Sequence, residues 1–520
     1  MAETTRRALA AWIPRGLAVA AGLAAALAQP PFAILPGLLG YAVILALIDR
    51  AVGPRPLRSA FLRGWLAGVG YFLLSLFWLA EPFQVNAMQQ GWMAPFAVAL
   101  TTAGMALFWG LAALAYRFSA PRGVARVVVF AGVFAAVEWL RGHILTGFPW
   151  DLPGETWRAG SPLSQAASLV GAYGLTWITL LIASAPAVIG EGRKGLATVA
   201  GAAGLLAALY GWGASRLREV PPTSASAPLL RIVQADVRQE SKYDPELFSS
   251  IVRRYVALTA APAAHAPDIV VWPEGAIPDA MEDYLASGAW PRAAIIAALK
   301  PGQTLILGGY RVANANVDPP VVYNSLAAFR RAGDDLTPLG VYDKFRLVPF
   351  GEFLPFDALA GRLGIKTFVH VGDGFTAGPR PRPLKLAGLP PVQPLICYEA
   401  LYPGFTREGA AASGVRAAWI VNISNDAWFG ATSGPWQHLN MASYRAIEEG
   451  LPMVRATPTG VSAVIDAFGR PEASLAEGAL GVIDRRLPPA LPPTPFSRFG
   501  DAPFALMLAV SLGLGLRRRS

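Results

Sequence analysis

The chain has 520 residues, of which 54% are hydrophobic and only 15% are charged, and its formal net charge at pH 7 is +10. A typical soluble chain has about 25% charged residues, so the composition excludes a disordered protein and argues against a wholly soluble enzyme. The single cysteine excludes an intrachain disulfide, and the four scattered histidines show no metal-ligand spacing. We therefore expect no metal and no cofactor.

Eight apolar stretches are predicted to cross a membrane as helices, because runs of about 17–25 apolar residues are long enough to do so. The first is not read as a cleaved signal peptide, although Arg6 and Arg7 precede it and small residues end it, because a second apolar run follows at once. The first and last stretches are short for a full crossing. In chain order the stretches lie at 16–28, 32–48, 60–80, 92–116, 124–140, 166–189, 196–212 and 502–516.

The basic residues predict the orientation of these spans. If the N-terminus is cytoplasmic, the inside segments carry 15 Lys and Arg residues, including Arg517–Arg519, whereas the short outside loops carry only Arg141 and Arg158. Because Lys and Arg favour the cytoplasmic side, both termini are predicted inside and the region between the seventh and eighth spans outside. The positive charge therefore has a topological explanation, and no nucleic-acid partner is expected.

Glu138 lies near the outer end of the fifth predicted span, close to Trp139 and Arg141. An ionisable side chain at membrane depth is a candidate functional residue. Near the interface, however, it can also be an ion-paired helix end, and the sequence leaves both interpretations open.

Between the seventh and eighth spans the pattern changes to that of a layered α/β domain. We expect a seven-helix domain at 1–215, linkers at 216–227 and 491–501, an outer domain at 228–490, and a final helix with a basic tail at 502–520. Runs such as Ile269–Trp272 lack polar alternation, which is typical of strands covered on both faces. The predicted strands are 229–233, 268–272, 304–307, 323–329, 392–397, 417–423 and 461–465, and the predicted helices are 245–264, 290–299, 402–412 and 435–449.

Three reactive side chains each follow, or end, a β-type run: Glu274, Lys344 and Cys397. The carboxyl ends of strands in α/β folds direct side chains into one crevice. A thiol is a strong nucleophile once ionised, a carboxylate can accept its proton, and an ammonium group can stabilise an oxyanion. No histidine lies near in sequence, so Glu274 must be the base.

Each of the three residues also has an ordinary structural interpretation. A lone cysteine at a strand end is commonly a small buried hydrophobe, a lysine in a loop is commonly solvated, and a glutamate after Trp-Pro is commonly a turn residue. Composition and spacing alone therefore leave the triad a hypothesis.

Three ordered blocks resemble the signature blocks of the nitrilase superfamily: Val271–Glu274, Tyr342–Lys344 with Leu347–Glu352, and Ile396–Glu399. Longer segments narrow the resemblance to the apolipoprotein N-acyltransferase family, whose members are membrane-embedded. These segments are 138–150 (EWLRGHILTGFPW), 347–355 (LVPFGEFLP), 422–430 (NISNDAWFG) and 434–441 (GPWQHLNM), so the resemblance covers nearly the whole chain.

The resemblance implies a fold and a function. The fold would be an α/β nitrilase-like αββα sandwich inserted between the transmembrane helices of an eight-span membrane domain. The enzyme would transfer the sn-1 acyl chain of a membrane phospholipid, through a thioester on Cys397, to the N-terminal amine of a diacylglyceryl-cysteine apolipoprotein. It would lie in the bacterial inner membrane with its catalytic domain on the periplasmic side. We expect a monomer.

The resemblance also implies roles for individual residues. Glu274 would be the general base, and Lys344 with the backbone N–H of Tyr398 would stabilise the oxyanion. The supporting or substrate-binding positions would be Glu352, Tyr398, Glu399, Asn324, Tyr243, Trp428 and Phe429. The loops at 353–356 and 368–375 are candidate acyl-chain contacts or lids, or ordinary packed loops.

The chain departs from the family pattern at two positions. Tyr243, next to Asp244, stands where the family often has a tryptophan, so the aromatic ring is kept and a hydroxyl is added. Pro458 stands where an asparagine is expected, so an amide group is missing there and an acceptor contact through that position is in doubt.

Two other function classes use the same residues. A membrane-tethered amidase or nitrilase would hydrolyse a small amide with water as the second nucleophile, using the same triad. A non-catalytic lipid- or lipoprotein-binding membrane protein would carry a dead enzyme-like domain. The eight-span context argues against the first, and the complete triad argues against the second.

Overall fold

The computed structural model describes residues 2–314, 320–355 and 374–516. Three parts of the sequence predictions lie outside the described residues: Phe356, residues 368–373 and the basic tail Arg517–Arg519. The chain divides into two compact units. Unit 1 comprises 1–220, 429–448 and 493–520, and unit 2 comprises 221–428 and 449–492.

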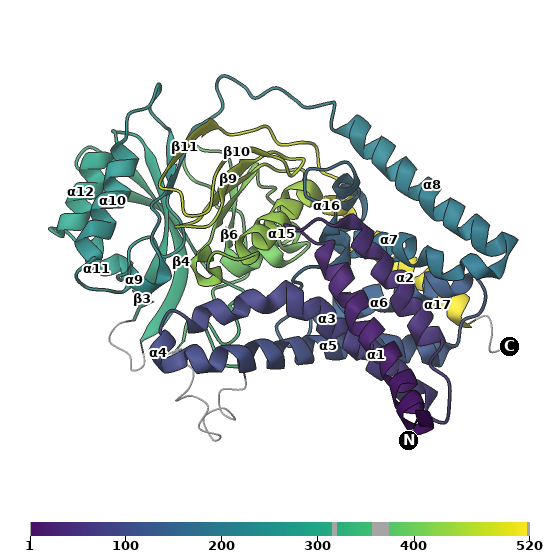
Figure 1. Ribbon diagram of the computed structural model, residues 1–520. Helices are drawn as coiled ribbons and strands as arrows, with labels where there is room; N and C mark the ends of the chain where they lie inside the picture. The colour runs from purple at the N-terminus through teal and green to yellow at the C-terminus, as the bar shows by residue number, and fades with distance from the viewer. Residues whose placement is uncertain (1, 315–319, 356–373, 517–520) are drawn as a thin grey trace. The chain divides into compact units, whose positions relative to one another are not determined.

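Unit 1 is helical, and helices occur at all eight predicted spans (Figure 1). Its longer helices are α1 (Ala2–Leu27), α2 (Leu39–Asp49), α3 (Pro56–Leu76), α5 (Ala94–Ser119), α6 (Ala125–Arg141), α7 (Ala167–Ser184), α8 (Arg193–Arg216), α15 (Gly434–Glu449) and α17 (Ala502–Leu516). Within the described residues, four helical stretches are long and apolar enough to cross a membrane: Pro56–Phe83, Ala87–Ser119, Leu163–Glu191 and Arg193–Arg216. Shorter apolar helices lie at Trp12–Leu27, Leu35–Asp49 and Ala502–Leu516.

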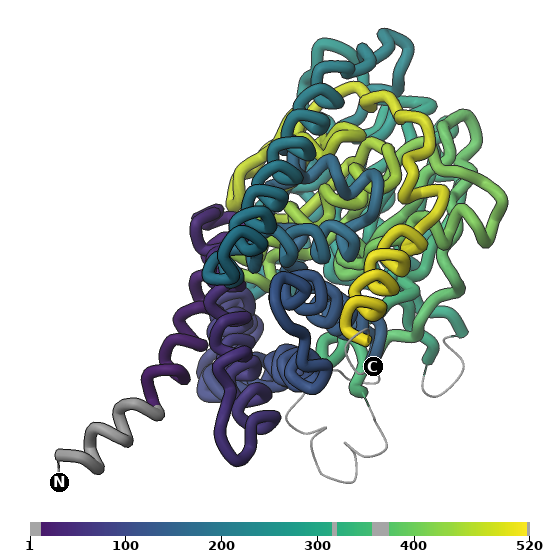
Figure 2. The backbone as a smooth tube through the Cα atoms, turned by 90° about the vertical axis from the view of Figure 1, so that its right-hand side faces the viewer, coloured from purple at the N-terminus to yellow at the C-terminus, as the bar shows by residue number. Residues whose placement is uncertain are grey.

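Small residues let the helices of unit 1 pack closely. A Cβ atom added at Gly22 of α1 would lie 1.8 Å from the carbonyl oxygen of Ala67 in α3, so only glycine fits there. Such close backbone approach is typical of helix pairs in membranes, where dispersion contacts replace the hydrophobic effect. The C-terminal helix α17, yellow in Figure 2, packs against α6 and α7. Trp177 of α7 donates a hydrogen bond of 3.0 Å to Ser511 of α17.

Glu138 is buried at the end of α6 and is fully engaged by neighbours in unit 1. Trp109 donates to its Oε1 atom at 2.6 Å, and the Nε atom of Arg141 donates to its Oε2 atom at 2.8 Å. Of the two interpretations left open by the sequence, these contacts favour the ion-paired helix end.

Unit 2 is built on two β-sheets (Figure 1). Its strands are β1 (Leu229–Gln234), β2 (Ile269–Val271), β3 (Thr304–Ala313), β4 (Val321–Ala332), β5 (Asp335–Asp343), β6 (Val392–Ile396), β7 (Trp419–Ile423), β8 (Met453–Ala456), β9 (Ser462–Ile465), β10 (Pro471–Leu475) and β11 (Gly481–Arg486). The six-stranded sheet has the order β11-β1-β2-β3-β4-β5, and the five-stranded sheet has the order β10-β9-β8-β7-β6. The central strands β1-β2-β3 and β6-β7-β8 are parallel, and the flanking strands are antiparallel.

The two sheets pack face to face around one apolar core that includes Ile232, Val271, Ile396 and Val421. The outer face of the six-stranded sheet is covered by helices α10 (Phe248–Ala260) and α12 (Trp290–Ala298) (Figure 1). The central strands are therefore buried on both faces, as the lack of polar alternation predicted. Strand β5 was expected only at its end, as the run before Lys344, and strands β8, β10 and β11 were not predicted, because these segments are short or carry charged residues that break the apolar pattern.

Candidate active site

The folded sheets carry the three reactive side chains at strand ends. Glu274 follows β2, Lys344 follows β5, and Cys397 follows β6. The pairing of β2 with β3 continues past the end of β2, since the N–H of Gly308 donates to the carbonyl of Pro273 at 3.2 Å and the N–H of Ala276 donates to that of Gly308 at 3.1 Å. This extension holds the backbone of Glu274 in a defined position.

Glu274, Lys344, Glu352 and Asn324 form a buried polar cluster in unit 2. The Nζ atom of Lys344 lies 3.3 Å from Oε1 of Glu274 and 2.9 Å from Oε1 of Glu352. The Nδ2 atom of Asn324 donates to the same two oxygens at 2.6 and 2.7 Å. All four residues are less than one-tenth exposed. Such charge-assisted hydrogen bonds offset the cost of burying these charges.

Cys397 sits at a sharp turn from strand β6 into a short 3₁₀ helix, Cys397–Leu401. Its φ angle is +49°, a conformation that costs a residue with a side chain about 1–3 kcal/mol and that clusters at functional sites. Turns of this kind present nucleophiles in other enzymes.

Glu399 holds this turn in place. Its carboxylate accepts backbone hydrogen bonds from Ile396, Phe345 and Arg346 and one from the hydroxyl of Tyr342, at 2.7–3.1 Å. Burial raises the pKa of Glu399 to about 7, and these hydrogen bonds oppose the rise. Glu399 therefore ties the Cys397 turn to the segment after Lys344, which is a structural role.

The charges around Cys397 favour the neutral thiol in the resting site. Burial and the carboxylate of Glu274 raise the pKa of Cys397 to about 12, against the lowering effect of Lys344 and of a hydrogen bond with Ser424. Burial by itself lowers the pKa of Lys344, but Glu274 and Glu352 outweigh it and the net shift is upward. The cluster thus holds a permanent ammonium group and a protonated thiol beside a carboxylate.

The raised pKa of Cys397 predicts how the thiol reacts with iodoacetamide. Only the thiolate reacts, so the alkylation rate of the purified protein is expected to increase from pH 7 to pH 10 without levelling. A small thiol with an ordinary pKa, about 8.5, should level off near the top of this range in the same buffers. Because the sequence has one cysteine, the rate reports on Cys397 alone. A plateau below pH 8 would contradict the electrostatics described above.

A second buried network, which the sequence did not predict, lies beside the thiol in the segment after β7. Ser424 donates to Oδ1 of Asp426 at 2.7 Å, and Arg455 donates to Oδ2 of Asp426 at 2.6 Å and also contacts Asn422. A polar run directly after a buried strand was the available signal. The sequence alone did not indicate that this polar run lies at the thiol, because it is the pairing of β6 with β7 that brings Ser424 to Cys397.

The remaining predicted residues lie in different places. The ring of Tyr398 is buried against Tyr402, with ring centroids 5.3 Å apart. Tyr243 is 63% exposed and Trp428 is 39% exposed, both in unit 2. Phe429 belongs to unit 1, where it packs against Trp78 and Trp150 and is buried. The structure thus brings Glu352 and Asn324 to the triad but assigns Phe429 to the helical unit.

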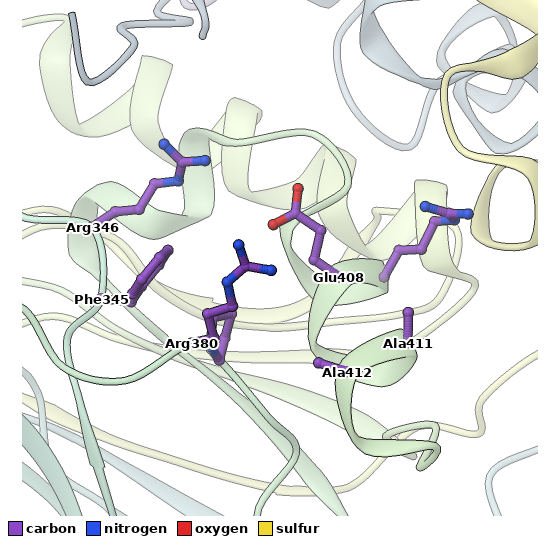
Figure 3. Close-up of a pocket in the computed structure, with 8 residues that line it drawn as sticks. Phe345, Arg346, Arg380, Glu408, Ala411 and Ala412 are labelled. Atoms are coloured by element: carbon purple, nitrogen blue, oxygen red, sulfur yellow. The ribbon is translucent and has the colours of Figure 1, made fainter.

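Unit 2 also has a surface hollow of about 460 Å³ next to the segment that follows Lys344. It is lined by Phe345, Arg346, Arg380, Pro381, Arg407, Glu408, Ala411 and Ala412. Figure 3 shows the guanidinium group of Arg380 and the carboxylate of Glu408 pointing toward one another. Glu408 therefore offsets part of the positive charge. Among the described residues, no group of three or more His, Cys, Asp or Glu side chains could hold a metal ion.

Comparison with known protein families finds a match for each of two regions of the chain. Residues 229–491 match the carbon-nitrogen hydrolase family, and residues 21–185 match the apolipoprotein N-acyltransferase N-terminal domain. An amidase of the nitrilase superfamily from Nesterenkonia is 18% identical with a TM-score of 0.34, covering 52% of this chain and 93% of the amidase. The match of residues 229–491 to the family model identifies the two-sheet unit as a carbon-nitrogen hydrolase domain.

Full-length relatives narrow the class to one family. An apolipoprotein N-acyltransferase of Caulobacter vibrioides is 57% identical over 504 residues, covering 96% of this chain and 94% of the relative. One of Bradyrhizobium diazoefficiens is 38% identical over 523 residues, covering 98% and 95%. The chain belongs to the apolipoprotein N-acyltransferase family.

Proposed function

We propose that this protein N-acylates apolipoproteins by a two-step transfer through Cys397. The acyl donor is a membrane phospholipid, and the acceptor is the α-amine of an N-terminal diacylglyceryl-cysteine. The observation that carries the proposal is the buried cluster of Glu274, Lys344 and Glu352 at the thiol of Cys397, in a chain that belongs to a family of acyltransferases.

In the first step the sulfur of Cys397 attacks the sn-1 ester carbonyl of the phospholipid. Because the thiol is protonated at neutral pH, a base must remove its proton as the C–S bond forms. Glu274, whose charge acts on the thiol, takes that proton. It then gives the proton to the departing alkoxide. The products are a thioester on Cys397 and a lysophospholipid.

The tetrahedral intermediate of this step carries an oxyanion that needs stabilisation in a dry site. Lys344 supplies it, together with the backbone N–H of Tyr398. The ammonium group is suited to this role because Glu274 and Glu352 keep it protonated. Glu352 and Asn324 hold the side chains of Lys344 and Glu274 in position.

In the second step the neutral α-amine of the acceptor attacks the thioester carbonyl. Glu274 accepts the amine proton as the C–N bond forms, and it passes this proton to the departing sulfur as the C–S bond breaks, which regenerates the thiol of Cys397 and the carboxylate of Glu274. Water must be kept from the thioester, since hydrolysis would compete with transfer. Tyr243 and Trp428, which are exposed aromatic residues of unit 2, are the positions that we assign to contacts with the acyl chains.

The acyl donor lies in the bilayer, so the active site must be held at the membrane surface. We propose that all eight helices at the predicted spans cross, with both termini cytoplasmic and the catalytic domain, residues 228–490, on the periplasmic side of the bacterial inner membrane. The support is the bias of 15 basic residues inside against two outside. Four of the helical stretches meet the length and hydropathy of a span.

Mass spectrometry of the detergent-purified protein tests the proposal. After incubation with phosphatidylethanolamine and phosphatidylglycerol and without acceptor, the Cys397 peptide is expected to carry an acyl mass that hydroxylamine removes. The Cys397→Ala variant should carry none, and a diacylated lipopeptide should discharge the wild-type adduct. An unmodified Cys397 in protein that hydrolyses a small amide would instead indicate a tethered amidase, and no reaction at all would indicate a binding protein.

A further inference from the structure

Asp343 is a buried charged residue directly before Lys344 that the mechanism above does not use. Its carboxylate accepts two hydrogen bonds from the guanidinium group of Arg311, at 2.7 Å from Nε and at 2.6 Å from Nη2, which is bidentate geometry. The hydroxyl of Ser325 also donates to Oδ1 of Asp343, at 2.6 Å. Arg311 lies in β3, Ser325 in β4 and Asp343 in β5. These three residues, which we call the strand clamp, therefore join three neighbouring strands.

The strand clamp and the catalytic cluster occupy opposite faces of the same strands. Successive side chains of a strand point to opposite faces of the sheet. In β4, Asn324 donates to Glu274 on one face, and Ser325 donates to the clamp carboxylate on the other. The pattern repeats at the end of β5, where Lys344 pairs with Glu274 and Asp343 pairs with the clamp arginine. The clamp thus holds together, from the opposite face, the strand segments that carry two members of the cluster.

The backbone of Lys344 is also held by its neighbours. Its N–H donates to the carbonyl of Asn324 at 2.8 Å, and its own carbonyl accepts from the N–H of Gly378 at 2.8 Å. Gly378 packs so closely that an added Cβ atom would lie 2.2 Å from the carbonyl oxygen of Asp343. A defined backbone position is needed here, because an oxyanion is stabilised only by a donor that lies within hydrogen-bond distance of it.

We propose that Asp343 is a positioning residue of the active site, which through the strand clamp fixes the end of β5 and so places the ammonium group of Lys344. The inference rests on the proposed acyl transfer and adds a residue to it. The carboxylate acts from the far face of the sheet, through the backbone that it shares with Lys344. The side chains of Arg311 and Asp343 are 27% and 11% exposed, so solvent ions screen their pairing less than that of a surface pair.

A double-mutant cycle with Lys344 tests this role. Asp343→Ala removes the carboxylate of the clamp, and Lys344→Met removes the ammonium group that the clamp places. Acylation of Cys397 is followed by quenched-flow mass spectrometry with phosphatidylethanolamine and phosphatidylglycerol in detergent micelles. We expect Asp343→Ala to acylate about tenfold more slowly than wild type, since a shift of a catalytic group by about 1 Å can cost about 10²-fold. In the Lys344→Met background, itself slower by about 10²–10³-fold, Asp343→Ala should change the rate by less than about twofold.

Asp335→Ala is the matched control. Asp335 begins β5 and also pairs with an arginine, Arg292, but it lies at the end of the strand remote from Lys344. It should acylate at the wild-type rate. A wild-type rate in Asp343→Ala, or an equal cost of this substitution with and without Lys344, would overturn the proposal. Asp343→Asn can still accept from Ser325, so its rate should lie between those of wild type and Asp343→Ala, and it takes the place of the alanine variant in the cycle if that variant does not fold.

A second measurement does not depend on acyl transfer. The ammonium group of Lys344 lowers the pKa of Cys397, so displacing this group should reduce the fraction of thiolate. Alkylation of Cys397 by iodoacetamide at pH 8.5 is expected to be about threefold slower in Asp343→Ala than in wild type, and Lys344→Met should abolish this difference. If wild-type Cys397 is never acylated, the proposed function fails, and the alkylation rates then decide the role of Asp343. Equal alkylation rates in Asp343→Ala and wild type would contradict it.

Discussion

Replacing Glu274 by glutamine is expected to slow acylation of Cys397 by about 10²–10⁴-fold, the usual contribution of a general base. The thiol is protonated at neutral pH because burial and Glu274 itself raise its pKa to about 12. Glu274 is the carboxylate of the cluster whose charge acts on the thiol, whereas Glu352 is held by Lys344, Asn324 and the backbone of Val348. The rate of thioester formation measured by mass spectrometry checks this expectation.

The same substitution should leave the fold intact. Lys344 keeps its contact with Glu352 at 2.9 Å, and the amide oxygen of a glutamine can still accept from Asn324. The unfolding midpoint of Glu274→Gln in detergent should therefore be close to that of wild type. Glu246→Gln, an exposed position in unit 2, is the matched control and should acylate at the wild-type rate. If Glu274→Gln also acylated at that rate, the base would have to be another residue.

The second large effect is expected in unit 1, where Arg445→Met should destabilise the protein by about 3–5 kcal/mol at pH 8.5. Arg445 of α15 lies 3.1 Å from Glu155 and 3.0 Å from Glu448, and all three side chains are buried. Glu448 also accepts a hydrogen bond of 2.8 Å from the N–H of Ala172. Without the guanidinium group, two buried carboxylates face each other with no cation between them.

The destabilisation by Arg445→Met should grow with pH. Burial raises the pKa of Glu155 to about 8 and that of Glu448 to about 7, and Arg445 lowers both. In the unfolded chain both titrate near 4.3, so the folded state holds more protons and stability falls as the pH rises through this interval. Without Arg445 the folded pKa values rise further, and the loss continues to higher pH.

Unfolding midpoints in detergent, followed by tryptophan fluorescence at pH 6 and pH 8.5, measure this effect. The gap between wild type and Arg445→Met should be wider at pH 8.5. Arg485→Met is the control, because its pair with Glu472 is half exposed at the arginine and such pairs contribute about 0–1 kcal/mol. If the difference in unfolding midpoint between wild type and Arg445→Met were equal at both pH values, the pKa values of the two carboxylates would not depend on Arg445.

The positions of the reactive residues could be predicted because each depends on a local pattern. Glu274, Lys344 and Cys397 follow β-type runs, and parallel strands direct their ends to one edge of a sheet. The buried central strands could be predicted from their uninterrupted apolar runs. The resemblance to the family added Asn324 and Glu352, which the structure brings to Glu274 and Lys344.

Other features of the site depend on contacts between segments that are distant in the chain. Ser424 reaches the thiol only because β6 and β7 pair. Lys242 appears in the sequence as one more polar residue of a loop, and its burial depends on how α9 (Gln239–Lys242) packs against Gly275. The periodicity of a sequence does not show which polar side chains are buried, because the same residue can be solvated in one fold and enclosed in another.

By itself, the amino-acid sequence determined the apolar helical part, the two-faced burial of the central strands, and the family to which the motifs point. Each of these properties depends on local composition or on short motifs, so it can be inferred without knowledge of long-range contacts. The tertiary structure decided which side chains share one buried space, as with Lys344 between two carboxylates. It also assigned residues 429–448, which are continuous in sequence with unit 2, to the helices of unit 1. Burial and charge pairing act through space, and only folding defines which charges are close enough to shift one another's pKa.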